Sequence, residues 1–223
     1  MSAKLFFGAI IKFLLGVVLV GALIFVPAGT LAFAYGWVLM GVLFIPMLLA
    51  GAVMMLKSPE LLKKRLNAKE KRGEQSLVVK LSGLMFLVGF VLAGLGFRFG
   101  WYVLPSWAVT VASCVFLLSY VMYAEVLREN AYLSRTVEIQ EGQKVIDTGL
   151  YGVVRHPMYA ATVLMFLSLP LVLGSVFSFL IFLAYPFIIA SRIKDEEELL
   201  CEQLEGYAEY RTRVKYRLIP FIW

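Results

Sequence analysis

The sequence predicts an all-α integral membrane protein with about six transmembrane helices, a C-terminal helical hairpin and a cytoplasmic amphipathic tail helix. Of its 223 residues, 61% are hydrophobic and only 16% are charged, whereas soluble domains have about 45–50% apolar and roughly 25% charged residues. The apolar residues gather in runs long enough to cross a bilayer as helices. These runs lack the strict apolar–polar alternation of barrel strands, which favours helices.

The uncharged runs give the positions of the expected spans. They lie at about residues 5–26, 31–56, 77–97, 103–125, 157–172 and 176–191. The first run lacks a signal-peptidase cleavage pattern, so we expect it to be retained as a helix.

The last two spans come from one segment of 35 residues, 157–191, that contains no Asp, Glu, Lys or Arg. A straight helix of that length would measure about 52 Å, against a hydrocarbon core of about 30 Å. Pro170, Gly174 and Ser175 interrupt the segment near its middle. We therefore expect two short spans joined by a tight turn.

The charges predict the orientation. With six spans, 20 of the 21 Lys and Arg residues and all 15 acidic residues fall on the side that holds both termini, and only Arg98 falls on the other. Basic loops stay in the cytoplasm. We therefore expect a protein of the cell inner membrane with cytoplasmic N- and C-termini. Basic residues that flank the spans account for the net charge of +6. The sequence has no module of interleaved basic and aromatic residues, so we expect no nucleic-acid partner.

The polar tail, residues 192–223, has apolar residues at roughly helical spacing. They are Leu199, Leu200, Leu204, Tyr207 and Val214. This pattern is typical of an amphipathic helix on the membrane surface, which should break near Gly206 or before Pro220. We divide the chain into an N-terminal hairpin with its basic loop, residues 1–76, and a core at 77–223.

The stretch RHPMY contains His156, the only histidine of the chain. Pro157 suits the first turn of a helix, so we expect His156 to cap the fifth span. The free N–H groups of a helix start attract anions, Arg155 adds a positive charge, and Tyr159 adds an aromatic wall. The alternative interpretation is a simple interfacial anchor, because Arg, His and Tyr are common at membrane helix ends.

The stretch DEEELL places Glu196 and Glu197 just past the last span. If the last two spans form a hairpin, these carboxylates return to the level of His156. A ligand with both a carboxylate and an amine, such as S-adenosylmethionine, would fit between them. The alternative is a solvated acidic run at a helix end.

Other kinds of site find little support. The sequence has no G-x-G-x-x-G that opens a βαβ unit and no Cys/His cluster with zinc spacing, so we expect no metal. Its two cysteines are too few for a disulfide framework. A serine hydrolase would have to use His156, and no nucleophile elbow is present.

Three blocks carry a resemblance to a known superfamily: GLYGVVRHPMYAA, RIKDEEELL and YAEYRTRVKYRLIPFIW. In this order, over about residues 125–223, they resemble bacterial-type members of the isoprenylcysteine carboxyl methyltransferase and phospholipid methyltransferase superfamily. Two positions depart from its pattern: Leu150 stands in place of proline, and Ala161 in place of glycine. The methyl group of Ala161 is expected to narrow the approach to a cofactor.

The resemblance implies a cytoplasmic pocket for S-adenosylmethionine. The implied cofactor-binding residues are Gly149, Tyr151, Arg155, His156, Pro157, Tyr159, Glu196 and Glu197. It also suggests Arg128, Glu129 and Asn130 as catalytic residues on the acceptor side. The implied activity is methyl transfer to a membrane-embedded or lipophilic acceptor, either like an isoprenylcysteine carboxylate or like a phospholipid. The alternatives are an NADPH-dependent membrane enzyme of the sterol-reductase type and a non-enzymatic scaffold or transporter.

Overall fold

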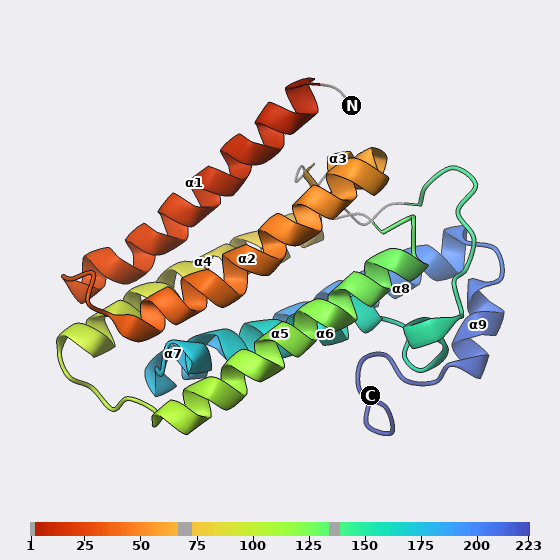
Figure 1. Ribbon diagram of the computed structural model, residues 1–223. Helices are drawn as coiled ribbons and strands as arrows, with labels where there is room; N and C mark the ends of the chain where they lie inside the picture. Colours follow the sequence, from red (N-terminus) through yellow and green to blue (C-terminus); the bar gives the residue numbers. More distant parts are fainter. Residues whose placement is uncertain (1–2, 67–72, 134–138) are drawn as a thin grey trace.

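The computed structural model describes residues 3–66, 73–133 and 139–223, and over these residues the protein is all-helical (Figure 1). The helices in order are α1 (Ala3–Ala28), α2 (Ala34–Lys57), α3 (Pro59–Leu66), α4 (Gly73–Arg98), α5 (Ser106–Glu129), the 3₁₀-helix η1 (Gly149–Gly152), α6 (Pro157–Val172), α7 (Val176–Phe182), α8 (Tyr185–Gln203) and α9 (Tyr207–Arg213).

Five helical segments of the described chain are long and apolar enough to span a membrane. They are α1, α2, α4, α5 and the combined segment α7–α8. The sixth expected span, α6, has the predicted bounds but only 16 residues, or about 24 Å of helix against about 30 Å of hydrocarbon. An integral membrane protein is therefore supported, and the count of six spans stays a prediction.

The expected turn between the last two spans lies at residues 173–175. Gly174 has a φ of +69°, and a Cβ there would lie 2.9 Å from the ring of Tyr35, so both the backbone and the packing favour glycine. The Ser175 hydroxyl accepts a hydrogen bond from the Ser178 amide at 3.2 Å and caps α7. Pro170, by contrast, lies inside α6. Glycine and serine therefore make the turn.

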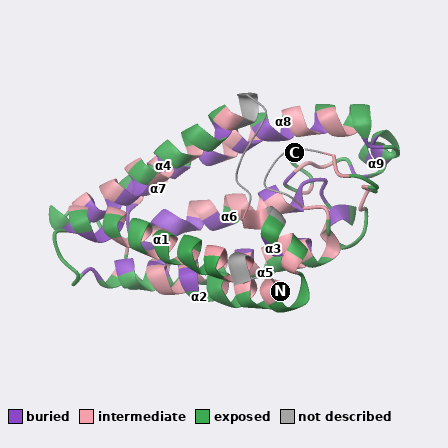
Figure 2. Ribbon diagram, turned by 90° about the horizontal axis from the view of Figure 1, so that it is seen from above, coloured by how far each residue is buried: buried purple, intermediate pink, exposed green. Residues whose placement is uncertain are grey.

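Close contacts between small and aromatic residues hold the helices together. A Cβ at Gly94 of α4 would collide with the Ile24 carbonyl of α1, and a Cβ at Gly89 would collide with the ring of Phe182 in α7. The Ser178 hydroxyl of α7 donates to the Gly89 carbonyl at 2.8 Å. Such small-residue contacts are the usual means of packing helices in lipid. Figure 2 shows exposed residues along the outer faces of the helices.

One buried apolar cluster joins the N-terminal helices to the rest of the bundle. It includes Ile24 and Leu39 together with Phe116 and Phe182, and α1 packs on α4 while α2 contacts α5 and α6. The cluster crosses the proposed boundary at residue 76. The division into 1–76 and 77–223 stays a prediction.

The polar segments gather at one end of the bundle. Figure 1 shows the N-terminus, α3, the end of α8, α9 and the C-terminus at this end, and the connections α1–α2, α4–α5 and α6–α7 at the other. Helix α8 continues to Gln203, and the chain turns at Gly206, whose φ is +81°, before α9. The break near Gly206 agrees with the prediction, and the surface position of the tail helix stays a prediction.

Candidate functional site

The RHPMY motif begins α6 and is joined there by the returning tail. Pro157 is the first residue of α6 and His156 is its N-cap residue, as predicted. The Arg155 amide donates to the Tyr216 carbonyl and the His156 amide to the Arg217 carbonyl, both at 2.9 Å. These two motif amides therefore bind the protein's own tail rather than an anion.

Glu197 lies at the centre of a buried ionic cluster. Its Oε1 accepts from Arg155 Nε at 2.6 Å and lies 3.2 Å from His156 Nε2, and its Oε2 accepts from Arg217 Nε at 2.8 Å. The Arg155 and Glu197 side chains are only 6% and 4% exposed. Arg155 Nη1 also donates to the carbonyls of Val214 and Lys215, both at 2.8 Å. The cluster therefore ties α8, the motif and the tail together.

Glu196, the neighbouring carboxylate, belongs to a second chain of contacts. The Tyr159 hydroxyl donates to Glu196 Oε2 and accepts from Arg192 Nε at 2.9 Å. The His156 ring stacks beside that of Tyr159, with centroids 5.7 Å apart and an angle of 26° between the planes. The hairpin therefore does return both glutamates to the level of the motif.

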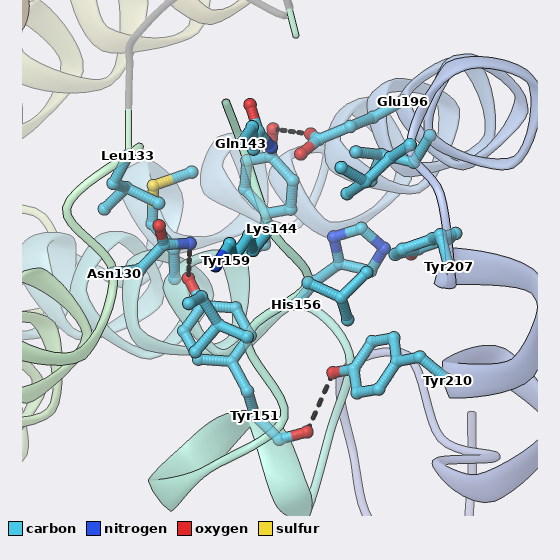
Figure 3. A pocket seen from close by; sticks show the side chains of 15 residues that line it. Asn130, Leu133, Gln143, Lys144, Tyr151, His156, Tyr159, Glu196, Tyr207 and Tyr210 are labelled. Atoms are coloured by element: carbon cyan, nitrogen blue, oxygen red, sulfur yellow. Dashed lines mark hydrogen bonds between the residues drawn. The ribbon is translucent and has the colours of Figure 1, made fainter. Parts of the chain in front are cut away.

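Tyr151 is held by two other elements. Asn130 Nδ2, at the end of α5, donates to the Tyr151 hydroxyl at 2.9 Å, and the Tyr210 hydroxyl of α9 donates to the Tyr151 carbonyl at 2.8 Å (Figure 3). Burial raises the pKa of Tyr151 to about 12. Its phenol therefore stays protonated and uncharged at neutral pH.

These residues surround a pocket that is open to solvent (Figure 3). The lining residues are Asn130, Leu133, Gln143, Lys144, Val145, Ile146, Tyr151, His156, Met158, Tyr159, Glu196, Leu200, Leu204, Tyr207 and Tyr210. Five predicted site residues are among them: Asn130, Tyr151, His156, Tyr159 and Glu196.

The other predicted cofactor-binding residues lie outside the pocket lining. Arg155 and Glu197 form the ionic cluster, and Pro157 is buried at the start of α6. Gly149 has a φ of +54°, and a Cβ there would lie 2.8 Å from Glu129 Oε1. Their direct role in cofactor binding stays a prediction.

Two predicted catalytic residues lie away from the pocket lining. Arg128 is 70% exposed and pairs with Glu125 at 2.6 Å. Glu129 Oε2 accepts from the Thr148 hydroxyl at 2.8 Å. Ala161 is completely buried and is also absent from the lining, so the expectation that its methyl group narrows the pocket finds no support.

Several lining residues were not among the predicted site residues. The spacing of Leu200, Leu204 and Tyr207 predicts an amphipathic helix on the membrane surface. In the structure these side chains line the pocket and a small core with Tyr210 and Val214. The Y-x-x-Y spacing was the available signal for Tyr207 and Tyr210. The segment 143–146 carries no comparable signal, because ordinary loop residues form it.

The pocket offers groups for a ligand that carries both charges and an aromatic ring. Glu196 supplies a carboxylate, Lys144 an ammonium, and Tyr151 and Tyr159 aromatic rings. The Tyr207 hydroxyl is the one buried side-chain polar atom of the described residues that lacks a hydrogen-bond partner. A buried hydroxyl normally has a partner, so this group is suited to a ligand. The described residues contain no group of three or more His, Cys, Asp or Glu that would hold a metal ion.

Comparison with known proteins supports the resemblance. Residues 108–202 match the model of the isoprenylcysteine carboxyl methyltransferase (ICMT) family, which supports the predicted superfamily and a membrane methyltransferase in general. The Delta(14)-sterol reductase TM7SF2 of Mus musculus is 31% identical over 91 residues, which are 40% of this chain and 22% of the reductase. The match thus spans about a fifth of the length of this reductase.

Proposed function

We propose, from the ICMT family match over residues 108–202, that the protein transfers a methyl group from S-adenosylmethionine to a lipophilic acceptor. The observation that carries the proposal is the pocket itself, which Glu196, Lys144 and Tyr207 line together. We place this pocket at the cytoplasmic face of the cell inner membrane, because the basic residues favour that orientation.

The lining groups fit the chemical groups of S-adenosylmethionine. Glu196 suits its positive charges, and Lys144 suits its carboxylate. The rings of Tyr151 and Tyr159 suit adenine, and the Tyr207 hydroxyl can form a hydrogen bond that it lacks within the described protein. S-adenosylmethionine supplies an electrophilic methyl group when it is bound.

The protein's contribution is to position groups and exclude water. The buried contacts of Glu197 fix the motif to α8 and the tail, and Arg192 and Tyr159 orient Glu196. Holding two reactants in the right geometry can provide about 7–11 kcal/mol of barrier lowering. An acceptor that is already a carboxylate or thiolate needs no proton removed. An amine acceptor must lose a proton, and Glu196 is the carboxylate that lines the pocket.

On the acceptor side, we assign Asn130 to the site. It lines the pocket at the end of α5 and is held by the Tyr151 hydroxyl. Glu129 is not in the pocket lining and accepts a hydrogen bond from Thr148. Arg128 is exposed outside the lining. The acceptor itself is either like an isoprenylcysteine carboxylate or like a phospholipid.

A reductase of the sterol-reductase type is the second candidate function, favoured by the 31% identity over 91 residues to the mouse Delta(14)-sterol reductase. Such an enzyme would use NADPH. Titration calorimetry of the protein in lipid nanodiscs, with S-adenosylmethionine and with NADPH, separates the two functions. We expect saturable binding of S-adenosylmethionine only. Saturable binding of NADPH without S-adenosylmethionine binding would overturn the proposal.

The same titration locates the cofactor. Replacing Glu196→Gln removes a charged partner worth about 1.5–3 kcal/mol, so the affinity should fall roughly 10- to 150-fold. Glu198→Gln is the matched control, since Glu198 is exposed on the same helix. Equal affinities of the two variants for S-adenosylmethionine would remove Glu196 from the site.

A radiolabelled methyl-transfer screen over prenylcysteine carboxylates, phospholipid amines and small hydrophobic thiols then identifies the acceptor.

A further inference from the structure

The chain ends in a tight turn, which we call the C-terminal hook, residues 218–223. The Leu218 and Ile219 amides both donate to the Trp223 carbonyl, at 2.9 and 3.0 Å, and the Trp223 amide donates to the Ile219 carbonyl at 3.1 Å. Phe221 has a φ of +67° and is the one non-glycine residue of the described chain with positive φ. Bulky residues rarely adopt this conformation, so the hook has a specific and strained shape.

This shape directs apolar side chains outward. Phe221 is 87% exposed, Ile222 77% and Ile219 49%. Three adjacent apolar side chains on a strained turn are unfavourable in water. Burying the exposed surface of the hook in an apolar environment would therefore be favourable.

The base of the hook lies against the membrane helices. Leu218 is buried in the same apolar cluster as the helices, and Trp223 packs against that cluster. Figures 1 and 2 both show the chain turning back from α9, so that the C-terminus lies beside the helices rather than beyond α9. The exposed tip is thus held beside the helices, at the end of the bundle where the polar segments gather.

The segment before the hook is basic. Arg211, Arg213, Lys215 and Arg217 alternate along it. Arg211, Arg213 and Lys215 are exposed, and the Arg217 guanidinium lies 5.3 Å from the centre of the Trp223 ring. Basic residues beside an apolar tip are typical of segments that bind anionic lipid headgroups.

We propose that the C-terminal hook is a membrane anchor that inserts Ile219, Phe221 and Ile222 into the bilayer interface, while the neighbouring basic side chains contact anionic headgroups. The anchor also reaches the pocket wall, since Arg217 joins the hook to Glu197. The interaction requires only a protein that spans the bilayer, so it does not depend on the identity of the cofactor or acceptor.

Spin-label depth measurements test the anchor. A nitroxide is attached at Ile222→Cys in the 223-residue protein that carries Cys114→Ala and Cys201→Ser, in nanodiscs of phosphatidylcholine with phosphatidylglycerol. Power saturation should show more collisions with oxygen, which concentrates in lipid, than with a water-soluble nickel complex. A label at Glu209→Cys, exposed on α9, is the matched control and should show the reverse.

Two further measurements decide between the possible surroundings of the hook. A label at Ile219→Cys should also prefer oxygen, and removing phosphatidylglycerol should make both hook labels shallower. A hook label that collides mainly with the nickel complex would overturn the anchor. Strong spin–spin broadening between copies, lost on dilution with unlabelled protein, would also overturn it and assign the hook to contact with a second copy.

Discussion

The two sides of the pocket wall differ in how their polar groups are satisfied. Behind the wall, Glu197 contacts Arg155, His156 and Arg217 and is almost completely buried. On the pocket side, Glu196 faces the cavity and the Tyr207 hydroxyl has no partner among the described residues. Adjacent residues of a helix point about 100° apart. Glu197 therefore makes its contacts within the protein, whereas Glu196 contacts Tyr159 and also lines the pocket.

The largest expected effect comes from the buried side. Glu197→Gln removes the charge that neutralises Arg155 and Arg217, and breaking a buried ion pair in this way costs about 3–5 kcal/mol. We expect a marked fall in the midpoint of thermal unfolding, measured in detergent by circular dichroism. Glu198→Gln, on the exposed side of α8, should leave the midpoint nearly unchanged. Equal midpoints for the two variants would contradict the structural role of Glu197.

The second prediction concerns the pocket side, where stability and binding should change in opposite directions. Tyr207→Phe removes a buried hydroxyl whose unsatisfied state costs about 1–3 kcal/mol, so the free protein should become more stable while affinity for S-adenosylmethionine falls. Tyr210→Phe is the control, because the Tyr210 hydroxyl already donates to the Tyr151 carbonyl. That variant should lose stability. A Tyr207→Phe protein that binds the cofactor normally would place the hydroxyl outside the site.

The smallest effect is expected at Ala161, which lies inside α6 and away from the pocket lining. Ala161→Gly restores the superfamily residue, but glycine within a helix costs about 0.5–1 kcal/mol relative to alanine. We expect a slightly lower unfolding midpoint and an unchanged affinity for S-adenosylmethionine by calorimetry. Tighter cofactor binding would show that position 161 does limit the pocket.

Much of the helical plan was predictable from composition. The uncharged runs gave α1, α2, α4 and α5 to within a few residues, and the bounds of α6 were predicted correctly. Pro157 marked the start of α6, and Gly174 and Ser175 marked the turn after it. These features are local, because a helix in lipid must satisfy its own backbone hydrogen bonds and its ends require particular residues.

The split of the last span was less predictable. The sequence placed one span at residues 176–191, whereas α7 ends at Phe182 and α8 runs from Tyr185 to Gln203. The amphipathic spacing of the tail was likewise ambiguous, since apolar residues at helical intervals pack equally well on lipid, on a pocket or on a small core. The partner surface decides, and no local pattern specifies it.

The sequence alone determined the class of protein, the order of its long helices and the two motifs that contain His156 and the two glutamates. Only the tertiary structure decided which groups face the pocket. It directs Glu196 inward and Glu197 into the ionic cluster, and it brings the tail carbonyls of Tyr216 and Arg217 to the motif amides. Helix formation depends on near neighbours along the chain, whereas these contacts join residues about 40 to 60 positions apart, whose meeting depends on the packing of the whole bundle.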